Sequence, residues 1–289
     1  MNHIIKLIYA AKGITIMRNT TNIQRISITI IAIIAVVACY FMYQSLTSPA
    51  RSVTKQENSV QLASEQAKNE IKKEAPKRFN GQERKVAYLT FDDGPGKYTA
   101  ELLDILRQNG AEATFFLIGE NVKQFPDLVK REKEEGHYVG MHSMTHNFKK
   151  LYTDGEYVNE MKEDQNLIAN ILKESPKLTR PPYGSMPGLN EELRNKAVKA
   201  GFTVWDWTID SLDWKYNKMP IDSASAQIVQ NVLAGATEPQ EVILMHDIHP
   251  QSVAAVPAII KGLKEKGYEL EAYHEEEHFP VNFWHDKRI

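Results

Sequence analysis

Short apolar runs alternate with amphipathic stretches from residue 85 onward, and this alternation constrains the fold more than any other feature of the sequence. The runs predict strands at 85–91, 113–119, 137–142, 177–180, 202–206 and 241–246. The amphipathic stretches predict helices at 98–109, 126–135, 156–173, 190–200, 223–234 and 253–266. Repeated β–α alternation indicates an α/β domain with a parallel sheet, either closed into a barrel or open.

Polar side chains follow several of these expected strands directly. They are Asp92 and Asp93, His142, Arg180, the segment 206–213, and His246. Ligands of parallel α/β folds bind beyond the carboxyl ends of the strands, whether the sheet is closed or open. The sequence therefore predicts that these residues form one site.

Two adjacent carboxylates and a histidine pair give this site the composition of a metal centre. Asp92-Asp93 follows one strand, and His142 and His146 either share a helical turn or lie at a strand end and in the turn after it. Imidazole nitrogen and carboxylate oxygen are ordinary ligands of zinc. Successive side chains of a strand point in different directions, so one aspartate can ligate while its neighbour acts as a base. The alternative is a polar turn in which an aspartate caps the helix from Tyr98.

The N-terminal part of the chain predicts membrane insertion. Residues 26–43 are almost entirely apolar, and 18 helical residues span roughly 27 Å, close to the thickness of a bilayer core. Basic residues precede this segment, and no acidic residue occurs before Glu57. This asymmetry predicts a cytoplasmic segment 1–25, a single-pass signal anchor at 26–43 in the cell membrane, and an extracytoplasmic catalytic domain. A lipidated Cys39, a secreted form and a true start at Met17 remain alternatives.

The rest of the sequence limits which cofactors and partners the chain can have. Residues 44–84 are polar and poor in aromatic residues, which predicts a linker. A single cysteine excludes an intramolecular disulfide framework and argues against a thiolate metal site. The net charge of -2 gives no reason to expect a nucleic-acid partner, and we expect a monomer.

Five segments carry a resemblance to a known family. They are Thr90–Pro95, His142–His146, Arg180–Gly184, Asp210–Trp214 and Leu244–Asp247. In this order they resemble the motifs of the polysaccharide deacetylases, carbohydrate esterase family four, over about residues 85–267. The resemblance implies a distorted (β/α) barrel for a catalytic domain at 85–270, leaving 271–289 as a C-terminal tail. Independently of the resemblance, the acidic run Glu275–Glu277 predicts that this tail is solvated, and loose metal binding by His274, His278 and His285 is the alternative.

The resemblance also implies the roles of the site residues. Asp93, His142 and His146 would hold a metal ion, Zn²⁺ or alternatively Co²⁺ or another divalent ion. Asp92 would be the general base, positioned by Arg180, whose charge would lower the pKa of that carboxyl.

The other roles concern the leaving group and the sugar. His246 would be the general acid, oriented by Asp213, with Asp210 as the alternative. Tyr183, Trp214 and Leu244 would line the substrate site, and the backbone N–H of Tyr183 would stabilise the oxyanion.

The function that follows from the resemblance is hydrolysis of an acetamido group on an acetylated glycan. We expect a zinc-dependent deacetylase of N-acetylglucosamine in peptidoglycan. Chitin oligomers, another acetylated polysaccharide and O-acetyl xylan are alternative substrates, because the motifs report the chemistry of the acetyl group. A non-catalytic glycan-binding protein of the cell envelope is the alternative from another class.

Overall fold

The computed structural model describes residues 78–79 and 82–289. The predicted segments 1–25 and 26–43 and most of the linker 44–84 lie outside this range. Within the part of the chain that is described, no helix has the length and apolar character needed to cross a bilayer.

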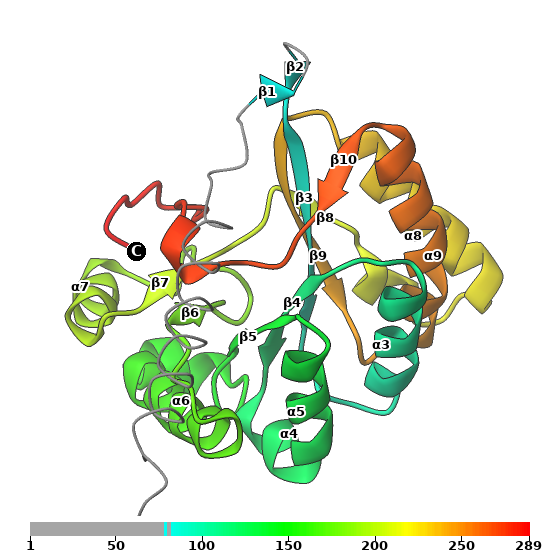
Figure 1. The fold of residues 1–289 in the computed structure, drawn as a ribbon. Helices are drawn as coiled ribbons and strands as arrows, with labels where there is room; N and C mark the ends of the chain where they lie inside the picture. The colour runs from blue at the N-terminus through cyan, green and yellow to red at the C-terminus, as the bar shows by residue number, and fades with distance from the viewer. Residues whose placement is uncertain (1–77, 80–81) are drawn as a thin grey trace, which may run out of the picture. The chain divides into compact units, whose positions relative to one another are not determined.

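A parallel sheet forms the centre of the domain (Figure 1). Its middle strand, β3 (Lys85–Asp92), pairs with β9 (Gln240–His246) on one side and β4 (Ala113–Leu117) on the other. The sheet continues from β4 through β5 (Tyr138–Met141), β6 (Leu178–Thr179) and β7 (Thr203–Val204). Beyond β9 lies β8 (Ile209–Asp210), while β10 (Tyr268–Leu270) pairs with the first residues of β3. Outside this sheet, β1 (Arg78–Phe79) and β2 (Gln82–Glu83) form an antiparallel pair.

Helices connect these strands. They are α3 (Thr99–Gln108), α4 (Gly119–Gln124), α5 (Pro126–Glu134), α6 (Tyr157–Leu172), α7 (Glu191–Ala200), α8 (Ile221–Gly235) and α9 (Pro250–Glu265). The described residues also form a π-helix (Lys149–Thr153) and two 3₁₀ helices (Asp213–Tyr216, Glu275–Glu277). The curled sheet and its helices form a half-barrel, consistent with the expected distorted (β/α) barrel.

The elements expected from the sequence are present, most of them within two or three residues of their expected ends. The strand expected at 113–119 stops at Leu117, because the chain turns at Ile118 into the short helix α4, which the sequence pattern did not reveal. Gly136 and Gly201 follow α5 and α7 with φ values of 93° and 77°, as expected for glycines that end helices.

The two faces of β3 have different environments, since successive side chains of a strand alternate. Ala87, Leu89 and Phe91 belong to the main core, which they share with the buried side chains of the helices. Val86 and Tyr88 belong to a second cluster that includes Trp205 and Tyr273. Thr90 and Asp92 have the parity of this second face. The period of the strand therefore directs Asp92 to the inside of the curled sheet.

Residues 271–289 are not a solvated tail, and this expectation was wrong. Tyr273 and Ile289 are buried, and Phe279 packs against the fully buried Trp205 with ring centroids 4.9 Å apart. Val281 forms a parallel bridge with Trp205. The aromatic residues of the segment need an apolar environment, which the inner face of the sheet provides. This segment is the red part of the chain beside β7 in Figure 1.

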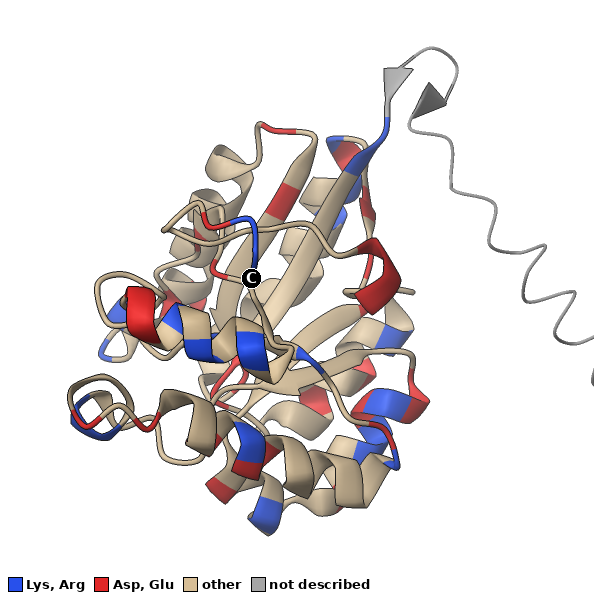
Figure 2. Ribbon diagram, turned by 90° about the vertical axis from the view of Figure 1, so that its left-hand side faces the viewer, with Lys and Arg blue, Asp and Glu red and all other residues tan. Residues whose placement is uncertain are grey.

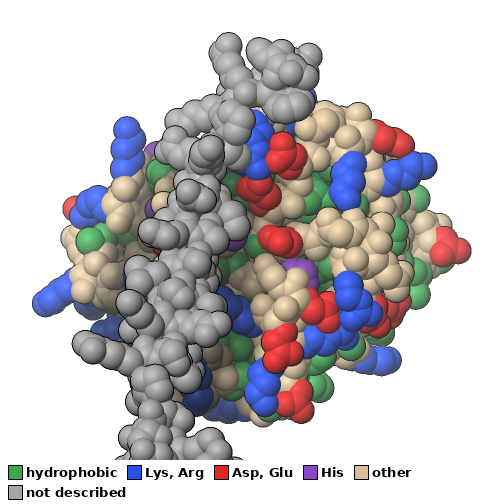
Figure 3. Space-filling view, in the orientation of Figure 1, with side chains coloured by type: hydrophobic (Ala, Val, Ile, Leu, Met, Phe, Trp, Pro, Cys, Tyr) green, Lys and Arg blue, Asp and Glu red, His purple; other side chains and the backbone are tan. Residues whose placement is uncertain are grey.

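Charged residues lie mostly on helices and loops, and the central strands contain few of them (Figure 2). On the face drawn in Figure 3, positive and negative side chains are interspersed. Some of the exposed charges form ion pairs along helices, such as Lys196–Glu192 and Lys123–Glu120. Such exposed pairs contribute little to stability.

Candidate active site

Asp92 and His246 come from paired positions of neighbouring strands. They are the last residues of β3 and β9, and they are Cα partners in the parallel register. Leu244 pairs with Thr90 two positions earlier in the same register. Paired residues of neighbouring strands point to the same face of the sheet, and such strands lie about 4.8 Å apart. The side chains of Asp92 and His246 therefore lie close together on one face. The register of two strands thus sets the spacing of a carboxylate and an imidazole.

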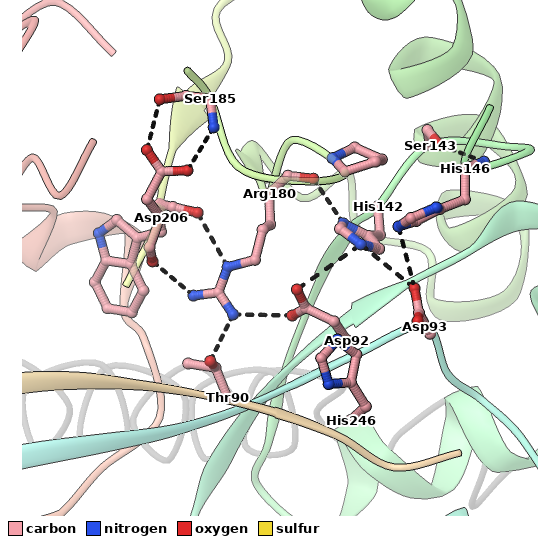
Figure 4. A network of polar contacts seen from close by, with 12 residues as sticks. Thr90, Asp92, Asp93, His142, Ser143, His146, Arg180, Ser185, Asp206 and His246 are labelled. Carbon is pink, nitrogen blue, oxygen red and sulfur yellow. Dashed lines mark hydrogen bonds and ion pairs between the residues drawn. The ribbon is translucent and has the colours of Figure 1, made fainter. Parts of the chain in front are cut away.

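Asp93, His142 and His146 converge on one point (Figure 4). Asp93 Oδ1 lies 3.5 Å from His142 Nε2 and 3.6 Å from His146 Nε2. One potential ligand atom from each residue lies within 4.8 Å of the others. Asp93 follows β3 with a φ of 72°, which turns its side chain away from the direction of Asp92.

The chemistry of these three residues fits a divalent metal ion. Asp93 Oδ1 is buried and has no hydrogen-bond partner among the described residues. His142 Nδ1 lies 2.7 Å from the carbonyl oxygen of Arg180, which fixes the proton on Nδ1 and leaves the Nε2 lone pair facing Asp93. Burial lowers the pKa of His142 well below its ordinary value, which keeps the imidazole neutral as a metal ligand must be. One oxygen and two nitrogen ligands leave further coordination positions for water and substrate.

Two acids of α6 hold the loop that carries both histidines. Glu160 accepts hydrogen bonds from the backbone N–H groups of Met144 and Thr145, at 3.1 and 3.0 Å. Asp164 accepts one from the N–H of His142 at 3.2 Å. Their spacing of four residues places them on one face of the helix. The loop needs this support because its backbone has positive φ at His146.

Arg180 is fully buried and contacts the carboxylate of Asp92 (Figure 4). Its Nη1 donates to Asp92 Oδ1 at 2.8 Å and to Thr90 Oγ1 at 2.5 Å. Its Nε and Nη2 donate to the carbonyl oxygens of Trp205 and Asp206. Four hydrogen bonds fix the guanidinium and, through it, one oxygen of Asp92.

The net effect of this environment on Asp92 differs from the expected one. Burial raises the pKa of Asp92, and this effect exceeds the lowering by the charges of Arg180 and His246. The pKa of Asp92 is therefore raised to about 6, whereas the sequence predicted a lowered value. The difference arises because the carboxylate is almost completely excluded from solvent. Near neutral pH most of this carboxylate is still ionised.

His246 is held by Asp213 and not by Asp210. Asp213 Oδ1 lies 2.8 Å from His246 Nδ1, and Asp213 Oδ2 accepts from the backbone N–H of His246. Ser252 Oγ also donates to Asp213. Asp210 instead accepts from the backbone N–H of Leu212. Burial alone would lower the pKa of His246, but its hydrogen bond to Asp213 and the nearby carboxylate charges raise it to about 9.

The residues of the metal site, Asp92 and His246 all line a pocket of about 480 Å³. The expected substrate residues Tyr183, Trp214 and Leu244 line it, together with Asp210 and Trp207. Tyr183 has a φ of 67°, and its hydroxyl donates to the carbonyl oxygen of His146 at 2.9 Å. The volume is in the range of small-ligand sites, and the pocket combines apolar walls with a few convergent polar groups.

Comparison with known proteins agrees with this geometry. The family model for polysaccharide deacetylase matches residues 80–205. The chain is 77% identical over 273 residues to a peptidoglycan-N-acetylglucosamine deacetylase of Bacillus cereus, covering 94% of this chain and 100% of that protein. The chain belongs to the polysaccharide deacetylase family.

Solved structures give the same result for the fold of this deacetylase. The crystal structure of the polysaccharide deacetylase Bc1974 from Bacillus cereus matches with a TM-score of 0.71 and 83% identity, covering 71% of this chain and 100% of that one. A family 4 carbohydrate esterase from Streptomyces lividans, in complex with acetate, matches with a TM-score of 0.59 and 34% identity. That match covers 68% of this chain and 98% of the esterase.

The sequence did not assign a role to five residues that build or line this deacetylase site. They are Thr90, Glu160, Asp164, Asp206 and Trp207. The sequence did contain a signal for Thr90, because it lies two residues before Asp92 in a predicted strand and therefore points to the same face. Asp206 and Trp207 lie in the segment 206–213, which the sequence placed at the site without a role for either residue. Glu160 and Asp164 are four residues apart on an amphipathic helix, a pattern that equally fits a solvated face.

Proposed function

We propose that this chain removes acetyl groups from N-acetylglucosamine residues of peptidoglycan by metal-dependent hydrolysis, releasing acetate. The observation that carries the proposal is the placement of the triad Asp93–His142–His146 beside Asp92 and His246 in one pocket. The high identity to a peptidoglycan-N-acetylglucosamine deacetylase supports this substrate over other acetylated glycans.

Asp93, His142 and His146 would hold the metal ion, for which we propose Zn²⁺. When bound, such an ion polarises the acetyl carbonyl and lowers the pKa of a water molecule. Asp92 accepts the proton of the attacking water, and the hydrogen bond from Arg180 leaves Asp92 Oδ2 available for it. Asp92 Oδ2 lies 3.8 Å from His142 Nε2, which places the base beside the metal ligands.

His246 donates the proton that the leaving amine needs. Asp213 holds Nδ1, so Nε2 is the atom that transfers the proton. A pKa of about 9 for His246 and about 6 for Asp92 gives a protonated acid and an ionised base over the neutral range. Both pKa values are raised, but neutral pH lies between them, which is the arrangement that acid–base hydrolysis requires.

The pocket walls position the acetyl group and the sugar. Leu244 is apolar and nearly buried, which suits contact with the acetyl methyl group. Trp214 is half-exposed and offers a ring surface to the sugar. The backbone N–H of Tyr183 has no partner among the hydrogen bonds of the described residues, so it is free to donate to the developing oxyanion.

The proposed location follows from the sequence alone. An apolar segment at 26–43 anchors the protein in the cell membrane, and the polar linker lets the catalytic domain reach the glycan outside.

Release of acetate from purified peptidoglycan tests the function. We expect release by the purified protein, loss of release after chelation, and recovery on addition of Zn²⁺. The Asp92→Asn variant, which keeps the shape of the side chain but cannot act as a base, is the matched control. Release from N-acetylglucosamine oligomers but not from peptidoglycan would replace the substrate and keep the chemistry. Release that persists after complete removal of metal would refute the proposal.

A further inference from the structure

Phe148 is an exposed aromatic residue beside the catalytic pocket. Its side chain is 45% exposed, although a phenyl ring gains free energy from burial. Its ring centroid lies 5.6 Å from that of Tyr183, which lines the pocket and is itself 57% exposed. The two rings meet edge to face at 65° and extend the aromatic lining from the pocket wall outward, and we call this pair the Phe148–Tyr183 shelf.

Neighbouring contacts hold this shelf in place. Phe148 packs against Tyr152 with ring centroids 5.0 Å apart, and the Tyr152 hydroxyl donates to the carbonyl oxygen of Pro182. The Tyr183 ring packs edge-on against the His146 ring at 4.5 Å. The shelf is therefore tied to a metal-ligand residue on one side and to the Tyr183 loop on the other. A ring fixed in this way loses little conformational entropy when a ligand covers it.

We propose that the Phe148–Tyr183 shelf binds a second sugar ring of the glycan, adjacent to the one whose acetyl group is removed. This inference rests on the proposed function and adds a residue, Phe148, that determines the preference for chain length. The substrate is a polymer, so rings beyond the catalytic pocket must lie on its rim. A pyranose ring has an apolar face of C–H groups, which pack favourably on the electron-rich face of an aromatic ring.

Among residues 84–289, one phenylalanine besides Phe148 is exposed, and it lies in a different environment. Phe125, between α4 and α5, is 37% exposed, but it has no aromatic contact among the described residues and does not line the pocket. Single exposed apolar residues of this kind are common on protein surfaces. Phe125 therefore serves as a matched control for the loss of a phenyl group as such.

The test compares Phe148→Ala, Phe125→Ala and the unmodified protein on N-acetylglucosamine oligomers of two to six sugars. We expect Phe148→Ala to lower kcat/KM for the longest oligomer about three- to tenfold, as for the loss of one aromatic contact. For the shortest oligomer that is hydrolysed, kcat/KM should change by less than about twofold. Phe148→Trp should restore the preference for long oligomers, and Phe125→Ala should leave it unchanged.

Binding provides a second measurement that does not depend on turnover. Each substitution is combined with Asp92→Asn, and the affinities for the shortest and longest oligomers are compared by calorimetry. If the unmodified protein deacetylates no oligomer, the proposed function on peptidoglycan still stands or falls by its own assay, and a length-dependent loss of affinity would still support the shelf. Equal losses for short and long oligomers, or no loss for either, would overturn the inference.

Discussion

Replacing Arg180 by methionine should destabilise the protein in a manner that depends on pH. Arg180 is fully buried, and its guanidinium makes four hydrogen bonds, including the ion pair with Asp92 at 2.8 Å. Methionine fills a similar volume but donates no hydrogen bond. Asp92, itself almost completely buried, then has no cationic partner at this position.

The magnitude follows from which form of Asp92 is buried. When the carboxylate is ionised, breaking a buried pair costs about 3–5 kcal/mol. When it is protonated, the cost falls to that of the unsatisfied acceptors, about 1–3 kcal/mol. In the unmodified protein the pKa of Asp92 is raised by burial to about 6, and the folded state favours the protonated form as pH falls. Without Arg180 this pKa rises further, so the stability deficit of the variant grows as pH rises above about 6.

Urea unfolding at pH 5 and pH 8, with a chelator present in both cases, measures this difference. We expect a deficit in unfolding free energy at pH 8 that exceeds the deficit at pH 5 by about 1–3 kcal/mol. Arg194→Met is a matched control, because Arg194 also pairs with an acid, Asp286, and lies over an aromatic ring. The deficit in unfolding free energy of Arg194→Met should be the same at pH 5 and pH 8. Hydrogen bonds from Arg288 and Arg194 lower the pKa of Asp286 far below pH 5, so its charge does not change between these two pH values. Equal deficits at pH 5 and pH 8 for Arg180→Met would refute the charge argument.

Three further predictions concern the metal, the acid and a buried carboxyl group. Asp92→Asn should lower kcat by at least about a hundredfold while the protein still binds metal, whereas His142→Ala should lose metal in a competition assay with a chelating dye. Asp213→Asn removes the partner that raises the pKa of His246, so the basic limb of the pH–rate profile should move to lower pH; an unmoved limb would contradict the assignment. The carboxyl oxygens of Glu132 are buried and have no hydrogen-bond partner among the described residues, and burial raises the pKa of this group well above its ordinary value. The protonated form is therefore favoured in the folded protein, and the folded state loses stability as pH rises and this form is lost. Glu132→Gln should therefore be more stable than the unmodified protein at pH 8 by about 1–3 kcal/mol, with a smaller gain at pH 5, and an equal gain at both would contradict this.

The fold was predictable because its signals are local and repeated. Each long buried strand, such as β3 or β9, is an apolar run in the sequence. Glycines such as Gly136 and Gly201 mark the ends of helices. The two-residue strands β6 and β7 lie within predicted runs, whereas β8, equally short, was not expected from the sequence. The segment 271–289 was misjudged because its acidic residues suggested solvent exposure, although its aromatic residues pack inside the sheet.

The residues of the candidate site were predictable from the sequence, but the direction of the pKa shift of Asp92 was not. Neighbouring parallel strands bring Asp92 and His246 to the same edge, so strand ends alone predicted their proximity. The sign of the pKa shift of Asp92 depends on how completely solvent is excluded, which no sequence pattern gives. The choice of Asp213 over Asp210, in contrast, was implied by the resemblance, and the structure agrees, since Asp210 accepts from the backbone N–H of Leu212 instead.

The position of Arg180 connects the base to the C-terminal segment. In the described sheet β7 and β8 are the two end strands and do not pair with each other, and Asp206 lies between them in sequence. The backbone N–H of Asp206 donates to the carbonyl oxygen of Val281, and its carboxylate accepts from the N–H of Phe283 at 2.7 Å. The carbonyl oxygen of Asp206 in turn accepts from Arg180 Nη2. The C-terminal segment thus supplies the hydrogen bonds that a paired strand would give at this gap, and through Asp206 and Arg180 it fixes the orientation of Asp92.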